Sequence, residues 1–109
     1  MTLPSQESLT VEFKSDCRCL PDRDLIEAVV CMANAQGGDI YLGVEDDGTA
    51  TGLHQNHQHL EGLAALIANR TQPSVHVRVA CITCGDATVA QISVPAQPHP
   101  VATNEGLLK

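Results

Sequence analysis

The sequence predicts a single α+β domain with a mixed or antiparallel sheet and two helices packed on one face. Three observations support this fold class: a strand-like run near the N-terminus, two amphipathic helical segments, and two alternating runs near the C-terminus. The 109 residues suffice for one hydrophobic core. That core must be aliphatic, because the chain has one Phe, one Tyr and no Trp.

The first half of the chain predicts a strand, a helix and a second strand. Residues 8–14 (SLTVEFK) alternate apolar and polar side chains, the two-residue period of a half-buried strand. Residues 22–38 carry an apolar stripe at helical spacing that ends at two glycines, and we expect Asp22 as N-cap and Cys31 in the core. Residues 39–45 (DIYLGVE) predict the next strand. Residues 46–49 predict a turn, because Asp-Gly suits positive φ.

The second half predicts a helix and a hairpin. Residues 57–73 carry leucines and Ile67 at helical spacing and end at Pro73. Residues 75–82 (VHVRVACI) and 88–95 (TVAQISVP) alternate around a turn, as two antiparallel strands do. We expect Cys81 on the apolar face of the first of these strands.

The charge distribution argues against a large nucleic-acid footprint. The net charge of −7 arises within residues 1–50, where ten acidic residues face three basic ones, while residues 51–109 hold three of each. Nucleic-acid-binding domains usually show a basic surface and often aromatic stacking platforms, and this chain has two aromatic residues.

Localisation and redox state follow from what the sequence lacks. No apolar run is long enough to span a bilayer and no export signal precedes the domain, so we expect a cytoplasmic chain without a membrane partner. Five cysteines in such a chain indicate free thiols rather than a disulfide framework. The chain ends in EGLLK without a turn signal, which indicates a fragment of a longer protein.

Carboxylates are the first candidate metal ligands. Glu7 and Glu12 flank the start of the first strand, and an acidic run that includes Asp46 follows the second. If the two strands are neighbours, Glu7 or Glu12 comes close to Asp46, and converging carboxylates suit Mg²⁺ or Mn²⁺. The alternative is that these acids are solvated turn residues.

Other side chains leave alternatives open. Two sets could hold zinc: His54, His57 and His59 in HQNHQH, and the thiols of CRC (Cys17, Cys19) with those of CITC (Cys81, Cys84). Surface histidines and ordinary strand cysteines explain the same pattern. The local basic group consists of Lys14, Arg18 and Arg23, which could contact phosphate or pair with neighbouring acids.

Three motifs together carry a family resemblance: ESLTVEFK, MANAQGG and DIYLGVEDDGTATGL. The sequence resembles the Schlafen AlbA-type domain over nearly its whole length. The resemblance implies an α+β domain that is usually N-terminal in a longer chain, so residues 1–109 are expected to be one domain of a longer regulator. Bacterial members are described as DNA-binding transcriptional regulators. In some vertebrate relatives the fold is a metal-dependent ribonuclease, whose carboxylates matching Glu7, Glu12 and Asp46 hold the catalytic ion.

Three functional hypotheses follow. The first is a nucleic-acid-binding module, for DNA before RNA, in which Lys14, Arg18 and Arg23 contact the phosphates and other domains contribute affinity. The second is a ribonuclease or deoxyribonuclease lobe using Glu7, Glu12 and Asp46 with Mg²⁺ or Mn²⁺. The third is a non-catalytic homodimerisation module that pairs an exposed strand edge, such as residues 75–82, with its twin. We expect the first, and we expect no enzymatic activity.

Overall fold

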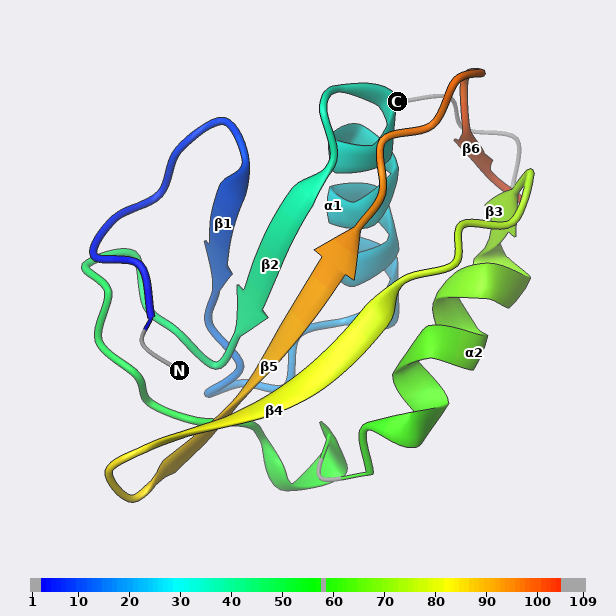
Figure 1. Ribbon diagram of the computed structural model, residues 1–109. Helices are drawn as coiled ribbons and strands as arrows, with labels where there is room; N and C mark the ends of the chain where they lie inside the picture. The colour runs from blue at the N-terminus through cyan, green and yellow to red at the C-terminus, as the bar shows by residue number, and fades with distance from the viewer. Residues whose placement is uncertain (1–2, 58, 105–109) are drawn as a thin grey trace.

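The computed structural model describes residues 3–57 and 59–104 of the chain. Its main sheet has four strands in the order β1-β2-β5-β4 (Figure 1). These strands are β1 (Val11–Lys14), β2 (Gly38–Leu42), β4 (Arg78–Cys84) and β5 (Ala87–Val94). β1 and β2 are parallel, whereas β5 runs antiparallel to both β2 and β4. The sheet is therefore mixed, as predicted.

Two helices and three short elements complete the fold. The helices are α1 (Asp22–Asn34) and α2 (Glu61–Arg70), and a 3₁₀ turn, η1 (Gln55–His57), precedes α2. Two-residue strands β3 (Thr71–Gln72) and β6 (Ala102–Thr103) form a second small sheet that the sequence did not predict. Within the described ranges, no helix has the length and apolar character needed to cross a membrane.

The main core lies between the helices and one face of the sheet, which confirms the predicted α+β fold. Ile40 and Ile92 of the sheet belong to one buried cluster with Val29 of α1 and Ile67 of α2. Successive strand residues point to opposite faces, so Tyr41 lies on the other side of the sheet from Ile40. There a smaller apolar cluster forms, consisting of Phe13, Tyr41, Val44, Ile82 and Val89. The Phe13 and Tyr41 rings meet edge to face, with centroids 6.2 Å apart.

Helix boundaries and two cysteines differ from the expectations. Pro21, in extended backbone, is the N-cap of α1 and Asp22 is its first helical residue. Cys31 is exposed, because it lines an open hollow between α1 and the edge strand β1 instead of lying in the core. Cys81 is also exposed, although it pairs with the buried Ala90. The predicted helix over residues 57–73 is shorter at both ends in the structure: His57 ends η1, α2 covers Glu61–Arg70, and β3 follows at Thr71–Gln72.

Candidate functional site

The parallel pairing of β1 and β2 brings two loops together at one end of the sheet. Lys14 and Leu42 are paired at the ends of their strands, so the chain leaves both strands on the same side. The loop after β1 then contacts the segment after β2. Cys17 Sγ lies 3.6 Å from Glu45 Oε2, and the backbone N–H of His54 donates to Asp16 Oδ2 at 2.8 Å. Residues 15–21 are called the β1–α1 loop below.

Glu7 and Glu12 lie near each other at the free edge of β1. Glu7 Oε1 accepts a hydrogen bond of 2.8 Å from the Phe13 backbone N–H, a group that no neighbouring strand pairs on this edge. Glu12 Oε1 lies 3.6 Å from Lys14 Nζ. Both glutamates line a hollow between β1 and α1, together with Cys31. The structure thus brings these two predicted carboxylates to one surface hollow.

Asp46 lies in the exposed turn that follows β2. This turn lies next to Phe13, because a Cβ atom built on Gly48 would be 3.9 Å from Phe13 Cε2. Glu12, in contrast, lines hollows beside α1. In the described part of the chain, Glu7, Glu12 and Asp46 are not a group whose ligand atoms all lie within 4.8 Å of one another. A metal site built from these carboxylates therefore stays a prediction.

Two carboxylates of the acidic run are held ionised by neighbouring hydroxyls. The Thr51 hydroxyl donates to Glu45 Oε2, and this bond, with further help from Ser15, lowers the pKa of Glu45 below its ordinary value. Hydrogen bonds from Thr49 lower the pKa of Asp47 in the same way. This end of the sheet therefore keeps its negative charge well into mildly acidic solution.

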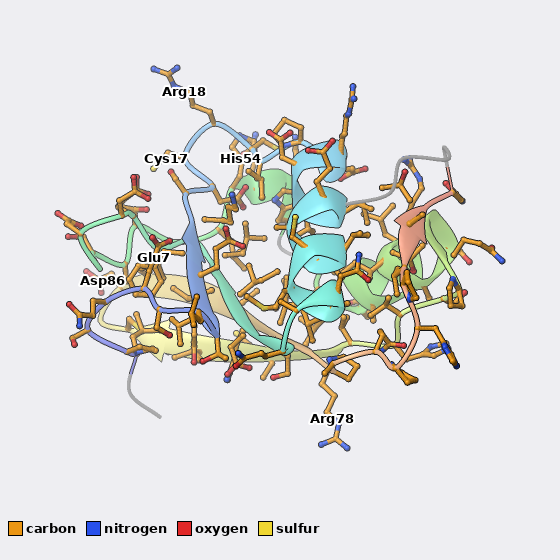
Figure 2. The ribbon with its side chains drawn as sticks, turned by 90° about the horizontal axis from the view of Figure 1, so that it is seen from above. Glu7, Cys17, Arg18, His54, Arg78 and Asp86 are labelled. Atoms are coloured by element: carbon orange, nitrogen blue, oxygen red, sulfur yellow. The ribbon has the colours of Figure 1, made fainter. Side chains whose placement is uncertain are left out.

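Two of the basic residues each line one of two adjoining hollows at the start of α1, and acidic residues line both hollows as well. Lys14 lines one hollow together with Glu27, and Arg23 Nε lies 3.4 Å from Glu27 Oε1. Arg18 lines the other hollow, and Leu20 borders both. Arg18 projects into solvent from the β1–α1 loop and forms no ion pair with any described residue (Figure 2). Lys14, Arg18 and Arg23 are called the basic group below.

A buried cluster that the sequence did not indicate as a unit lies behind this loop. Asp16, Cys19 and His57 each place one potential ligand atom within 4.8 Å of the others. His57 and Cys19 belong to the predicted zinc motifs, but their partner Asp16 is 41 residues away from His57 and was not singled out. The four thiols of CRC and CITC, by contrast, do not form a metal-ligand group among the described side chains. His59 is exposed, apart from the cluster.

Comparison with known proteins identifies the domain. The sequence matches the family profile described as Schlafen, AlbA_2 over residues 7–108. The chain belongs to this family. Schlafen AlbA_2 membership confirms the resemblance carried by the ESLTVEFK, MANAQGG and DIYLGVEDDGTATGL motifs. A search of curated proteins found no match.

Two solved structures share the fold of this Schlafen AlbA_2 domain. The crystal structure of the DIP2311 protein from Corynebacterium diphtheriae superimposes with a TM-score of 0.75 at 24% identity, covering 92% of this chain and 20% of that one. The N-terminal domain of a RecG-related protein from Nitrosomonas europaea, named for an ATP-dependent DNA helicase, gives a TM-score of 0.63 at 24% identity. That match covers 83% of this chain and 65% of the other. The chain thus spans a fifth of the length of the first protein and just under two thirds of the length of the second.

Proposed function

We propose that this Schlafen AlbA_2 domain is a nucleic-acid-binding module, with DNA as its main target, of a bacterial transcriptional regulator. The observation that carries the proposal is the exposed Arg18, which has no acidic partner among the described residues and lines a hollow that shares Leu20 with the hollow lined by Lys14. Family membership supports the assignment, as does the likeness to a domain of a protein named for a DNA helicase.

The ion pairs around the basic group do not prevent phosphate binding. Lys14 pairs with Glu12, and Arg23 with Glu27, at distances of 3.6 and 3.4 Å between partly exposed side chains. Surface pairs of this kind contribute about 0–1 kcal/mol each, so a phosphate can replace a carboxylate at little cost. The charge of −7 still repels a polyanion. The domain therefore binds weakly by itself and strongly in the company of other nucleic-acid contacts.

A titration with a matched pair of charge reversals tests this proposal. Fluorescence anisotropy of a labelled DNA duplex is followed at low salt with the wild-type chain, Arg18→Glu and Arg78→Glu. Both variants change the net charge equally, but Arg18 and Arg78 project from opposite sides of the fold (Figure 2). We expect Arg18→Glu to weaken binding at least fivefold and to reduce the salt slope by about one. Equal effects of the two variants, or no binding by the wild type at high micromolar concentration, would overturn the proposal.

Homodimerisation is a second function that one observation favours. β4 lies at an edge of the main sheet, and Arg78 is the one charged residue among its seven. Natural edge strands usually carry more charge or a proline, because an unprotected edge pairs with other strands. Light scattering of the chain tests this: a monomer at millimolar concentration would exclude it. Thr83→Lys, which adds a charge at an exposed position of β4, is expected to dissociate such a dimer.

The alternative of a nuclease lobe that uses Glu7, Glu12 and Asp46 is supported by the hollow that Glu7 and Glu12 share at the edge of β1. Carboxylates that hold a divalent ion can activate water and stabilise the charge that develops on a phosphate. Incubation of structured RNA with the chain and Mn²⁺, beside Glu12→Gln, tests this role. Equal cleavage by both proteins would eliminate it.

A further inference from the structure

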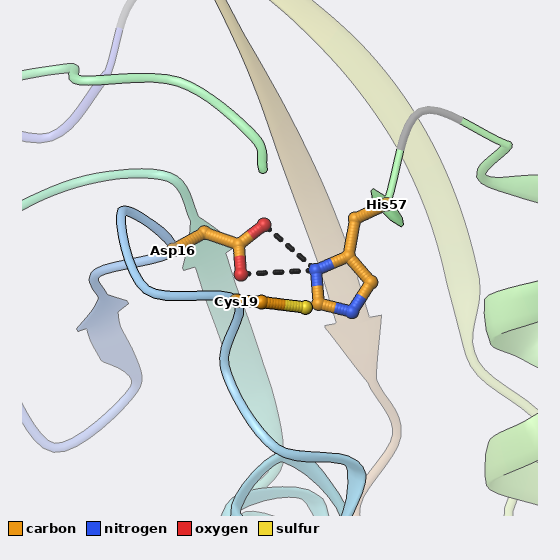
Figure 3. Close-up of side chains that lie close together, drawn as sticks. All are labelled: Asp16, Cys19 and His57. Atoms are coloured by element: carbon orange, nitrogen blue, oxygen red, sulfur yellow. Dashed lines mark hydrogen bonds and ion pairs between the residues drawn. The ribbon is translucent and has the colours of Figure 1, made fainter. Parts of the chain in front are cut away.

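The Asp16, Cys19 and His57 cluster, called the DCH cluster below, joins two loops that are distant in sequence. Asp16 and Cys19 belong to the β1–α1 loop, and His57 ends η1 (Figure 3). An oxygen, a sulfur and a nitrogen of these side chains lie within 4.8 Å of one another. None of its three residues belongs to the basic group or to the predicted Glu7, Glu12 and Asp46 site, although Cys19 lines a hollow together with Arg18.

The carboxylate of Asp16 is buried and is held in place by hydrogen bonds. The residue is 0% exposed, Oδ1 accepts the Leu20 N–H at 2.7 Å, and Oδ2 accepts the His54 N–H at 2.8 Å. No Lys or Arg pairs with it in the described ranges. A buried carboxylate needs a partner group to offset the loss of its hydration. The compensating group in the structure is His57, whose Nδ1 lies 2.7 and 2.9 Å from the two oxygens.

The thiol of Cys19 is turned toward this pair by an unusual backbone conformation. Cys19 has φ = 58°, the left-handed region that residues other than glycine rarely occupy. The Asn56 side-chain amide donates to Cys19 Sγ at 3.7 Å, and Asn56 directly precedes His57. The loop thus holds the sulfur beside the imidazole at a cost in backbone strain.

We propose that the DCH cluster binds a transition-metal dication of the Zn²⁺ type through Asp16, Cys19 and His57. Zn²⁺ accepts sulfur, nitrogen and oxygen ligands together, whereas Mg²⁺ and Ca²⁺ require oxygen ligands. Each Asp16 oxygen retains a lone pair after accepting its backbone hydrogen bond, so coordination does not displace Leu20 or His54. Three protein ligands leave the fourth tetrahedral position for water or an external ligand.

Metal binding replaces the Asp16–His57 hydrogen bond. The Cys19 thiol loses its proton to solvent and binds as thiolate. His57 releases to solvent the Nδ1 proton that it donates to Asp16, and it then binds through Nδ1 as the neutral ring with its single proton on Nε2. The Nδ1–Oδ2 distance then opens from 2.7 Å to about 3.4 Å, the spacing of two ligands on a tetrahedral Zn²⁺. A small rotation of the His57 ring supplies this change.

A titration with Co²⁺, followed by displacement with Zn²⁺, tests the site. The reduced chain without a histidine tag is expected to bind one equivalent of Co²⁺ with a thiolate-to-metal charge-transfer band and strong visible bands of tetrahedral Co²⁺. Cys19→Ser is expected to lose the charge-transfer band, and His57→Gln to bind at least tenfold more weakly. The matched control is Cys17→Ser, two residues away, whose thiol contacts Glu45 instead; it is expected to retain the band.

A second readout separates metal binding from a structural role of Cys19. Zn²⁺ is expected to raise the unfolding midpoint of the wild type and of Cys17→Ser, because it binds the folded chain, but not that of Cys19→Ser. Cys19→Asn is the second variant, since Asn tolerates a left-handed φ and offers no thiolate. Circular dichroism checks that each variant folds. A wild type without the thiolate band, or either Cys19 variant with the band and affinity of the wild type, would overturn the proposal.

Discussion

The side-chain amide of Asn34 forms two hydrogen bonds with the backbone of Val101, 67 residues further along the chain. Asn34 Nδ2 donates to Val101 O at 2.9 Å, and Asn34 Oδ1 accepts the Val101 N–H at 2.7 Å. Asn34 ends α1 within the MANAQGG motif, and Val101 is fully buried in the main core. The amide therefore acts as a substitute strand partner that holds the C-terminal segment against the domain.

Replacing this amide by an acid is expected to destabilise the fold. Asn34→Asp removes the donor and places a carboxylate oxygen against the Val101 carbonyl, which costs about 2–3 kcal/mol in the free energy of unfolding. Urea denaturation measures the effect at neutral pH. Gln36→Glu introduces the same charge at an exposed position two residues later and is expected to change stability by less than about 0.5 kcal/mol. Similar losses in both variants would contradict the role of Asn34.

Two glycines are expected to respond in opposite directions to alanine. Gly37 has φ = 73°, and a side-chain carbon there would lie 2.6 Å from backbone atoms of Val94 and Ala96, so Gly37→Ala should cost about 3 kcal/mol. Gly62 lies in α2 with no atom within 4 Å of such a carbon. Gly62→Ala should therefore stabilise the protein by about 0.5–1 kcal/mol. Thermal unfolding of both variants measures whether each substitution lowers or raises stability. A destabilising Gly62→Ala would count against the described α2.

Asp16→Ala is expected to be the most destabilising of the acid-to-alanine substitutions. It leaves the N–H groups of Leu20 and His54, and the ring of His57, without their shared acceptor, a loss of about 3–5 kcal/mol. Asp47→Ala, at an exposed turn position, serves as the control. The free energy of unfolding without added metal, from chemical denaturation, decides the comparison. A loss below 1 kcal/mol for Asp16→Ala would show that the two loops do not depend on this carboxylate.

The hydroxyl of Thr51 is expected to control the ionisation of Glu45. The pKa of Glu45 is lower in the folded chain than its ordinary value of 4.5, chiefly because Thr51 donates to the carboxylate. The ionised Glu45 therefore stabilises the folded chain. This contribution is complete above pH 4.5 and is lost as the pH falls through the lower pKa of the folded state. Carboxyl-selective NMR titration of Thr51→Val should show the pKa of Glu45 raised toward 4.5. Thr49→Val is expected to raise the pKa of Asp47 instead, and a Glu45 response to Thr49→Val alone would contradict this assignment.

The local spacing of apolar residues predicted the fold, because the buried face of each helix or strand is marked by residues close together in the sequence. The alternation of Ile40, Tyr41 and Leu42 gave the two faces of β2, and the long stripe of α1 gave its packing side. The exposure of Cys31 was missed, since it depends on which strand forms the sheet edge. The two-residue β3 and β6 are too short to produce a period.

The candidate sites depended on contacts between distant segments, which the sequence expresses less directly. The sequence indicated Lys14, Arg18 and Arg23 as a local group, but not that Arg18 is the one without an acidic partner in the described structure. The loop sequence around Asp16 has no distinctive motif. Asp16 is important because the fold places His57, 41 residues later in the sequence, within hydrogen-bond distance of it. A buried carboxylate becomes recognisable when its burial and its acceptor bonds are known.

We propose above that the surface formed by the β1–α1 loop and the start of α1 binds nucleic acid. A ¹H–¹⁵N NMR titration of the full chain with a short DNA duplex at low salt tests it most directly, because each backbone amide reports its own surroundings. We predict that the largest shifts fall within residues 14–23, around Arg18, and that they reverse on addition of salt. Shifts that cluster instead around Arg78 on β4, or a spectrum unchanged at high micromolar DNA, would contradict the claim.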